Sequence, residues 1–134
     1  MKAVISYVPE ELHQPQSAVY LQVSYLKRLF PLIRQLGATG VLLEWEDMFP
    51  FSGPLSFIAA GNSYSRQEVE DILTAARGSE LEVIPLVQTF GHVEFALKHP
   101  EFAGLREVPE SPQALCPSLN ASLDFVEKLI EQVR

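Results

Sequence analysis

The sequence predicts an α/β fold in which parallel strands alternate with helices, as in the N-terminal part of a (β/α)8 TIM barrel. Short apolar runs of strand length alternate with segments of helical periodicity, the turns between them are short, and the last strand ends in a polar cluster. In such folds ligands bind at the carboxyl ends of the strands, because helices cover the faces of the sheet. A complete barrel needs about 250 residues. The 134 residues could therefore hold roughly the first third to half of one.

The first half of the chain predicts one helix and one or two strands. Apolar residues recur at helical spacing from Val23 to Leu36, and Gly37 follows where a left-handed helix end is expected. Pro31 is expected to kink this helix or to divide it into two shorter ones. Gly40 to Trp45 is an apolar, branched run that predicts a strand, and Ala3 to Val8 could form another.

The middle of the chain predicts a loop, a helix and a strand in that order. The loop runs from Met48 to Gly61 and is rich in proline and glycine. Ser65 and Glu68 form the sequence pattern of a capping box, which opens a helix that is expected to end at Gly78. The next strand is expected from Glu82 to Val87.

The last third predicts two helices with a loop between them. A short helix is expected near Val93 to Lys98, ending before Pro100. The prolines between Glu101 and Pro117 predict a loop. The apolar stripe expected on the final helix consists of Leu123, Val126, Leu129, Ile130 and Val133.

Polar side chains follow the two strands at their carboxyl ends. Strand alternation would place Glu44 and Glu46 on one face, and Gln88 on the matching face of the next strand. If that face lines a barrel, these side chains converge, and Trp45 and Phe90 flank them with rings on which a sugar could stack. The candidate binding residues are Glu44, Glu46, Asp47, Gln88, His92 and Glu94.

Simpler interpretations of the same residues remain open. Acidic residues at strand ends are often solvated, and a histidine after a glycine is often a turn residue. Glu44 and Glu46 could also act as the two carboxylates of a glycosidase, although both would then approach the sugar from one side.

Composition and charge exclude several classes of function. A net charge of −7 argues against binding to nucleic acid or to an anionic membrane surface. The apolar run near the amino terminus is too short for a signal peptide, so we expect a cytoplasmic or nucleocytoplasmic protein. Cys116 is the only cysteine and is expected to be a reduced, buried thiol. The three histidines lack metal-ligand spacing and no nucleotide-binding motif occurs, so no metal or cofactor is expected.

Three segments resemble the family-20 glycoside hydrolases, and within that family the intracellular β-N-acetylhexosaminidases. They read SYLKRLFPLIRQLGATGVLLEWEDMFPF, YSRQEVEDIL and LEVIPLVQTFGHVEFALKHPEFAGLREV. The resemblance covers residues 23–134, which would be a partial catalytic barrel, and leaves residues 1–22 as a divergent segment. Gly91 and His92 match the end of a family motif, whereas Gln88 stands where the family has an aspartate and Phe90 where it has a proline. The resemblance implies that His92 helps to shape the sugar subsite.

The family's reaction removes terminal β-linked N-acetylglucosamine or N-acetylgalactosamine from glycans and glycoconjugates. The mechanism is retaining and substrate-assisted: the acetamido oxygen of the sugar attacks its own anomeric carbon, an aspartate orients the acetamido group, and the adjacent glutamate protonates the leaving oxygen. These two residues form an Asp-Glu dipeptide after the fourth strand.

No Asp-Glu dipeptide occurs in this sequence, where Glu46-Asp47 and Glu70-Asp71 run in the opposite order. The sequence ends in the helix before the strand that would carry the pair, so we expect this piece to be inactive alone. Two alternatives remain. The chain could be a non-catalytic, truncated interaction or regulatory module, or a different barrel enzyme whose acids lie among Glu44, Glu46 and Glu94.

Overall fold

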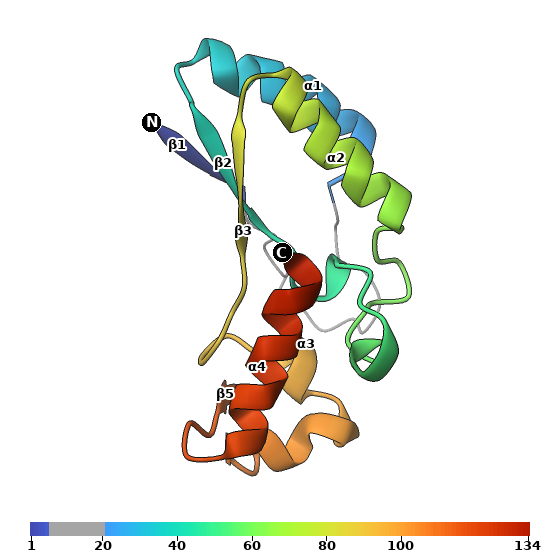
Figure 1. Cartoon of the computed structure of the whole chain (residues 1–134), viewed down its shortest axis with the longest axis vertical. Coiled ribbons are helices and arrows are strands. Elements are labelled where there is room, and N and C mark those ends of the chain that lie inside the picture. Colours follow the sequence, from blue (N-terminus) through green and yellow to red (C-terminus); the bar gives the residue numbers. More distant parts are fainter. Residues whose placement is uncertain (6–20) are drawn as a thin grey trace. The chain divides into compact units, whose positions relative to one another are not determined.

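The computed structural model describes residues 1–5 and 21–134. The chain divides into two compact units, the first within residues 1–45 and 64–86, and the second within residues 46–63 and 87–134. The first unit carries a parallel sheet and two long helices, and the second carries shorter helices, a hairpin and the final helix (Figure 1). Most of the expected divergent segment 1–22, and the end of the strand expected from Ala3 to Val8, lie outside the described residues.

The sheet of the first unit has three parallel strands in the order β1 (Lys2–Ile5), β2 (Gly40–Glu44) and β3 (Glu82–Leu86). Along β2, Val41 and Leu43 are buried, as expected from the alternation of the strand. On the opposite face Leu42 and Glu44 are half-buried.

Helices α1 (Val23–Gln35) and α2 (Arg66–Gly78) pack side by side on one side of this sheet (Figure 1). Each turns an apolar stripe inward because its apolar residues recur three and four positions apart. Full burial of a large apolar side chain stabilises the fold by about 1.5–3 kcal/mol. The buried helical residues are Leu26, Phe30, Ile72 and Ala76.

The helix boundaries differ in part from the expectation. α1 continues through Pro31, so the predicted division into two shorter helices is wrong. Proline removes only one backbone hydrogen bond, and the residues buried before it hold the helix in place. Gly37 has the expected left-handed conformation, with φ of 91°. α2 ends at Gly78, as expected, and the left-handed residue after it is Glu80, with φ of 55°.

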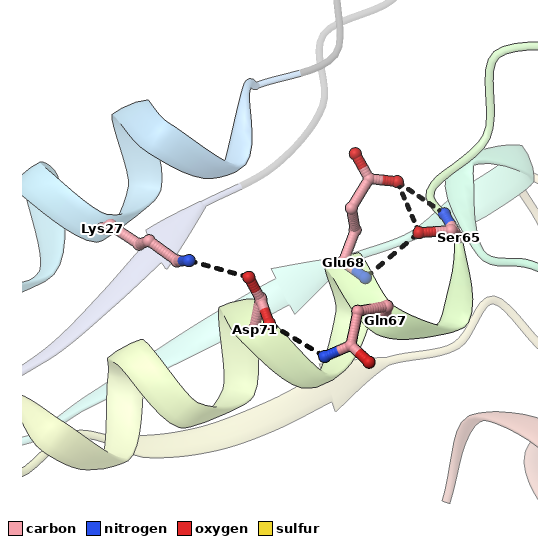
Figure 2. Close-up of polar contacts among 5 residues, drawn as sticks. All are labelled: Lys27, Ser65, Gln67, Glu68 and Asp71. Carbon is pink, nitrogen blue, oxygen red and sulfur yellow. Dashed lines mark hydrogen bonds and ion pairs between the residues drawn. The ribbon is translucent and has the colours of Figure 1, made fainter.

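The predicted capping box at the start of α2 is confirmed (Figure 2). The backbone N–H of Ser65 donates to the Glu68 carboxylate at 2.8 Å, and the backbone N–H of Glu68 donates to the Ser65 hydroxyl at 3.2 Å. The hydrogen bond from the Ser65 backbone, and then that from its hydroxyl, lower the pKa of Glu68. One turn later, Asp71 accepts from Lys27 of α1 at 2.8 Å and from Gln67 at 3.1 Å, and these contacts lower its pKa.

The second unit consists of short elements around its own apolar core. Its helices and strands are η1 (Glu46–Met48), η2 (Gly53–Leu55), α3 (Glu94–Leu97), η3 (Pro100–Leu105), β4 (Arg106–Val108), β5 (Ser111–Leu115) and α4 (Asn120–Val133), where η denotes a 3-10 helix. The core consists of Phe51, Leu55, Ile58, Val93, Phe95, Ala96, Leu97, Leu115, Phe125 and Leu129. Every helix within the described ranges is too short or too polar to cross a membrane.

A β-hairpin stands where the sequence predicted only a proline-rich loop. β4 and β5 are antiparallel, with Arg106 opposite Leu115. The Arg106 guanidinium donates through Nε and Nη2 to the Leu97 carbonyl, at 3.0 and 2.6 Å, and through Nη1 to the Pro109 carbonyl at 2.9 Å. Pro109 lies in the turn and Pro112 in a two-stranded ribbon, both positions where a missing N–H is tolerated.

The buried face of α4 matches the predicted stripe in part, since Leu129 lies in the core and Val126 and Val133 pack against it. Phe125 and Leu129 are buried, whereas Leu123 and Ile130 are exposed. Phe125 packs against Phe102 of η3, with ring centroids 5.1 Å apart. An aromatic ring buries more area than an aliphatic side chain, so this contact favours the face of the helix that carries Phe125.

Replacing Gly40 with alanine should destabilise the first unit. A Cβ at Gly40 would lie 2.9 Å from the Glu82 carbonyl oxygen, which is backbone and cannot move away without disturbing the β2–β3 pairing. We expect Gly40→Ala to lower the free energy of unfolding by about 1–3 kcal/mol in thermal or urea denaturation. Gly78→Ala is the matched control, since nothing lies within 4 Å of its added Cβ, and it should be neutral or stabilising. Equal stability of Gly40→Ala and the unchanged chain would contradict the close approach.

Candidate functional site

The polar cluster does not follow strand alternation. β2 ends at Glu44, the last strand residue of the first unit's central strand. Glu46 opens η1 with a left-handed backbone, φ 44°, and Gln88 lies two residues beyond the end of β3. The prediction that Glu46 and Gln88 face the same way because of strand periodicity is therefore wrong. Of the six candidate binding residues, Glu44 belongs to the first unit and the remaining five belong to the second.

Within the second unit the structure does bring Glu46 and Gln88 together. The Gln88 side chain is buried, and its Nε2 donates to Glu46 Oε1 at 3.5 Å. Glu46 is half-buried. The contact is long for a hydrogen bond and joins residues 42 positions apart in the sequence. It places an amide and a carboxylate side by side.

The turn after Gln88 is fixed by backbone pairing with β5. The N–H of Leu115 donates to the Phe90 carbonyl at 2.9 Å, and the N–H of Val93 donates to the Gln113 carbonyl at 3.4 Å. Gly91 forms an isolated antiparallel bridge with Ala114 between these two bonds. His92, inside this paired segment, is exposed and left-handed, with φ of 56°.

Asp47 and Glu94 occupy different surroundings. The Asp47 carboxylate pairs with Lys98 Nζ at 2.9 Å, and its side chain is only 14% exposed. The Asp47 carbonyl accepts from the N–H of Ala60 at 2.8 Å. Glu94 is half-buried in the first turn of α3, where a negative charge is favoured by the free N–H groups of a helix start.

The two aromatic residues expected beside the site differ in exposure. Trp45 is 5% exposed and packs edge-on against Tyr64, with ring centroids 6.1 Å apart in the core of the first unit. Its ring is therefore not open to a sugar, contrary to the expectation. Phe90 is 56% exposed, in the turn that carries His92.

His99 is a partly buried polar residue that the sequence patterns did not single out. Its Nε2 is buried without a hydrogen-bond partner, although the residue as a whole is only half-buried. Burial, and then the positive charge of Lys98, lower the pKa of His99. Glu101, Asp47 and a hydrogen bond with the Phe95 backbone oppose this shift. The signal was available: His99 follows the buried Phe95 by four residues, which is the spacing of one helical face.

Cys116 is free and half-buried rather than fully buried as expected. In the part of the chain that the structure describes, no group of three or more His, Cys, Asp or Glu residues is arranged to hold a metal ion. The side chains that the structure brings together are the carboxylate of Glu46 and the amide of Gln88, and the turn that follows Gln88 carries an exposed imidazole and an exposed aromatic ring. Such groups can accept and donate hydrogen bonds to hydroxyls and can cover an apolar sugar face.

Comparison with known proteins identifies close relatives over most of the chain. Hexosaminidase D of Homo sapiens is 55% identical over 112 residues, which are 84% of this chain and 23% of the human protein. Hexosaminidase D of Bos taurus is 53% identical over 112 residues, which are 84% of this chain and 32% of the bovine protein. The expected resemblance is confirmed. The chain spans between about a quarter and a third of the length of these relatives, and no protein-family model matches it.

Solved structures confirm the expected fold class. The GH20 β-N-acetylhexosaminidase of Streptomyces coelicolor A3(2) superposes with a TM-score of 0.70 over 96% of this chain and 29% of that enzyme, at 19% identity. A mutant Streptomyces plicatus β-hexosaminidase in complex with its product GlcNAc gives a TM-score of 0.65 over 96% of this chain and 28% of that enzyme, also at 19% identity. The α/β arrangement with its parallel three-stranded sheet therefore corresponds to an N-terminal part of a TIM barrel.

The burial of His99 predicts a pH dependence of stability. Because its pKa is lowered in the folded chain, the unfolded chain binds the proton more readily. The contribution of His99 is fully present above about pH 6.5, the ordinary pKa of histidine, and is lost as the pH falls from there through the lowered value. His99→Asn, which keeps a polar group but does not titrate, should flatten this decline in urea denaturation series at successive pH values. Parallel declines for both chains would show that His99 is not responsible.

Proposed function

We propose that this chain forms part of the sugar-binding region of a β-N-acetylhexosaminidase. The observation that carries the proposal is the 55% identity over 112 residues with human hexosaminidase D. The substrates proposed for the whole enzyme are glycans and glycoconjugates that end in β-linked N-acetylglucosamine or N-acetylgalactosamine. The reaction proposed for it is retaining hydrolysis assisted by the substrate's own acetamido group.

The residues of the second unit that we propose to bind the sugar are Glu46 and Gln88, and His92 is proposed to shape the subsite. The carboxylate of Glu46 accepts hydrogen bonds from sugar hydroxyls, and the Gln88 amide both donates and accepts. Their mutual contact at 3.5 Å holds the two groups close before a sugar arrives. Phe90 offers an exposed ring in the same turn as His92. A pre-formed arrangement lowers the entropy that is lost on binding.

The chemical step needs groups that this sequence does not contain. In the proposed mechanism an aspartate polarises the acetamido group and the next residue, a glutamate, protonates the leaving oxygen. No Asp-Glu dipeptide occurs among the 134 residues. General acid catalysis and electrostatic stabilisation of the transition state are therefore both lost. The proposed role of the chain by itself is sugar binding without turnover.

The 134-residue chain should not hydrolyse an aryl N-acetylglucosaminide. Loss of the proton donor alone typically costs a factor of about 10² to 10⁴ in rate. The measurement is release of the aryl alcohol by the purified chain, compared with a buffer blank and with an intact hexosaminidase as positive control. A hydrolysis rate that exceeds the buffer blank and copurifies with the chain would refute the proposed inactivity.

The chain should nevertheless bind N-acetylglucosamine through its second unit. In an NMR titration, we expect the backbone amides around Glu46 and Gln88 to shift as the sugar is added. Gln88→Ala should weaken binding by about two- to tenfold, corresponding to the loss of one hydrogen bond. Gln113→Ala is the matched control, because its side chain is exposed on β5, and it should leave the affinity unchanged. Shifts absent from this region, or equal effects of both variants, would count against the proposed subsite.

A further inference from the structure

The η1 turn is attached to the rest of the second unit at several points around Asp47. Lys98, just after α3, places its Nζ 2.9 Å from Asp47 Oδ2. The Asp47 carbonyl accepts from Ala60 at 2.8 Å, and the neighbouring Met48 is 2% exposed. The turn thus has a charged contact, a backbone contact and a buried side chain within two consecutive residues.

The Asp47–Lys98 pair differs from the exposed pairs of the first unit. Its carboxylate side chain is 14% exposed, whereas in Lys2–Glu82 and Arg34–Glu80 the carboxylate side chains are 63% and 79% exposed. Exposed ion pairs contribute little, because solvent screens them and long side chains lose entropy. A carboxylate that is mostly withdrawn from water depends on its cation, since removal of that cation leaves it poorly solvated.

The residue directly before Asp47 is the one that meets Gln88. Glu46 has a left-handed backbone, which a residue with a long side chain adopts only where its surroundings impose it. Asp47 follows Glu46 in the sequence. If the position of Asp47 is fixed, the direction in which the Glu46 side chain points is restricted as well. The contact of Glu46 with Gln88 at 3.5 Å depends on that direction.

We propose that Asp47 and Lys98 are positioning residues, which fix the η1 turn so that Glu46 lies against Gln88. Asp47 then acts through Glu46 and does not itself bind the sugar. The relevance of this pair to sugar binding rests on the proposed function, but the effect on Glu46 and Gln88 does not. All four residues of this argument belong to the second unit: Glu46, Asp47, Gln88 and Lys98.

The test is the NMR spectrum of the sugar-free chain in a set of variants. Lys98→Met should shift the backbone amides of Glu46 and Met48 and the side-chain amide of Gln88, and Lys98→Arg should restore them because it keeps the cation. Lys128→Met, an exposed lysine on α4, is the matched control and should leave these signals in place. Unchanged Glu46 and Gln88 signals in Lys98→Met would overturn the proposal.

A second variant covers the case in which Lys98→Met does not fold. Asp47→Asn removes the charge and keeps the side-chain shape, and it should shift the same Glu46 and Gln88 signals. If Asp47→Asn folds and leaves them unchanged, the positioning role is wrong.

Sugar titration separates this inference from the proposed function. N-acetylglucosamine should bind Lys98→Met about threefold to tenfold more weakly than the unchanged chain, and Lys98→Arg nearly normally. If the unchanged chain does not bind the sugar, the proposed function fails, and the sugar-free signals of Glu46 and Gln88 still decide the positioning. If the signals shift while the affinity stays the same, the pair positions Glu46 against Gln88 but has no part in sugar binding, and the link to sugar binding is wrong.

Discussion

Backbone pairing between β5 and the turn after Gln88 is the constraint on which the second unit depends. The bonds at Phe90 and Val93 lie on either side of His92, so the chain between them has little freedom. A left-handed φ at a non-glycine residue such as His92 costs of the order of 1–3 kcal/mol and persists only where neighbouring contacts compensate for it. The same pairing directs the chain into α3, whose buried side chains form part of the core.

A second candidate residue, Glu46, also has a left-handed backbone. The structure describes three non-glycine residues with positive φ, and two of them, Glu46 and His92, belong to the polar cluster. The third, Glu80, simply ends the turn after α2. Strain of this kind concentrates where a side chain must be aimed rather than where a chain merely turns. The coincidence of strain with the Glu46–Gln88 contact therefore supports a functional interpretation of this cluster over simple solvated strand ends.

Local patterns in the sequence were sufficient for most helices and strands but not for the hairpin or the face of α4. The capping box of Ser65 and Glu68 and the left-handed Gly37 depend only on neighbours in sequence, and both are confirmed. The hairpin depends on pairing across a turn that contains Pro109, where proline content predicted only a loop. The face of α4 depends on Phe102, more than twenty positions earlier, which no helical periodicity reveals. Tertiary contacts overrode local preference at both places.

The candidate site shows the same division between local and distant causes. Its residues could be named from the sequence because polar groups cluster after strands, but their contacts could not. Asp47 pairs with Lys98, 51 positions later, and Gln88 meets Glu46 from 42 positions away. Glu94 stands four residues before Lys98, so local spacing would have favoured a Glu94–Lys98 pair instead. Only the folded chain shows which carboxylate Lys98 binds.

A glutamine at position 88 is compatible with the neighbouring Glu46 carboxylate. The family pattern has an aspartate at this position, where this chain has Gln88. Two carboxylates at a separation near 3.5 Å would repel, and one of them would have to take up a proton. An amide avoids that conflict, because its Nε2 donates a hydrogen bond to the Glu46 carboxylate.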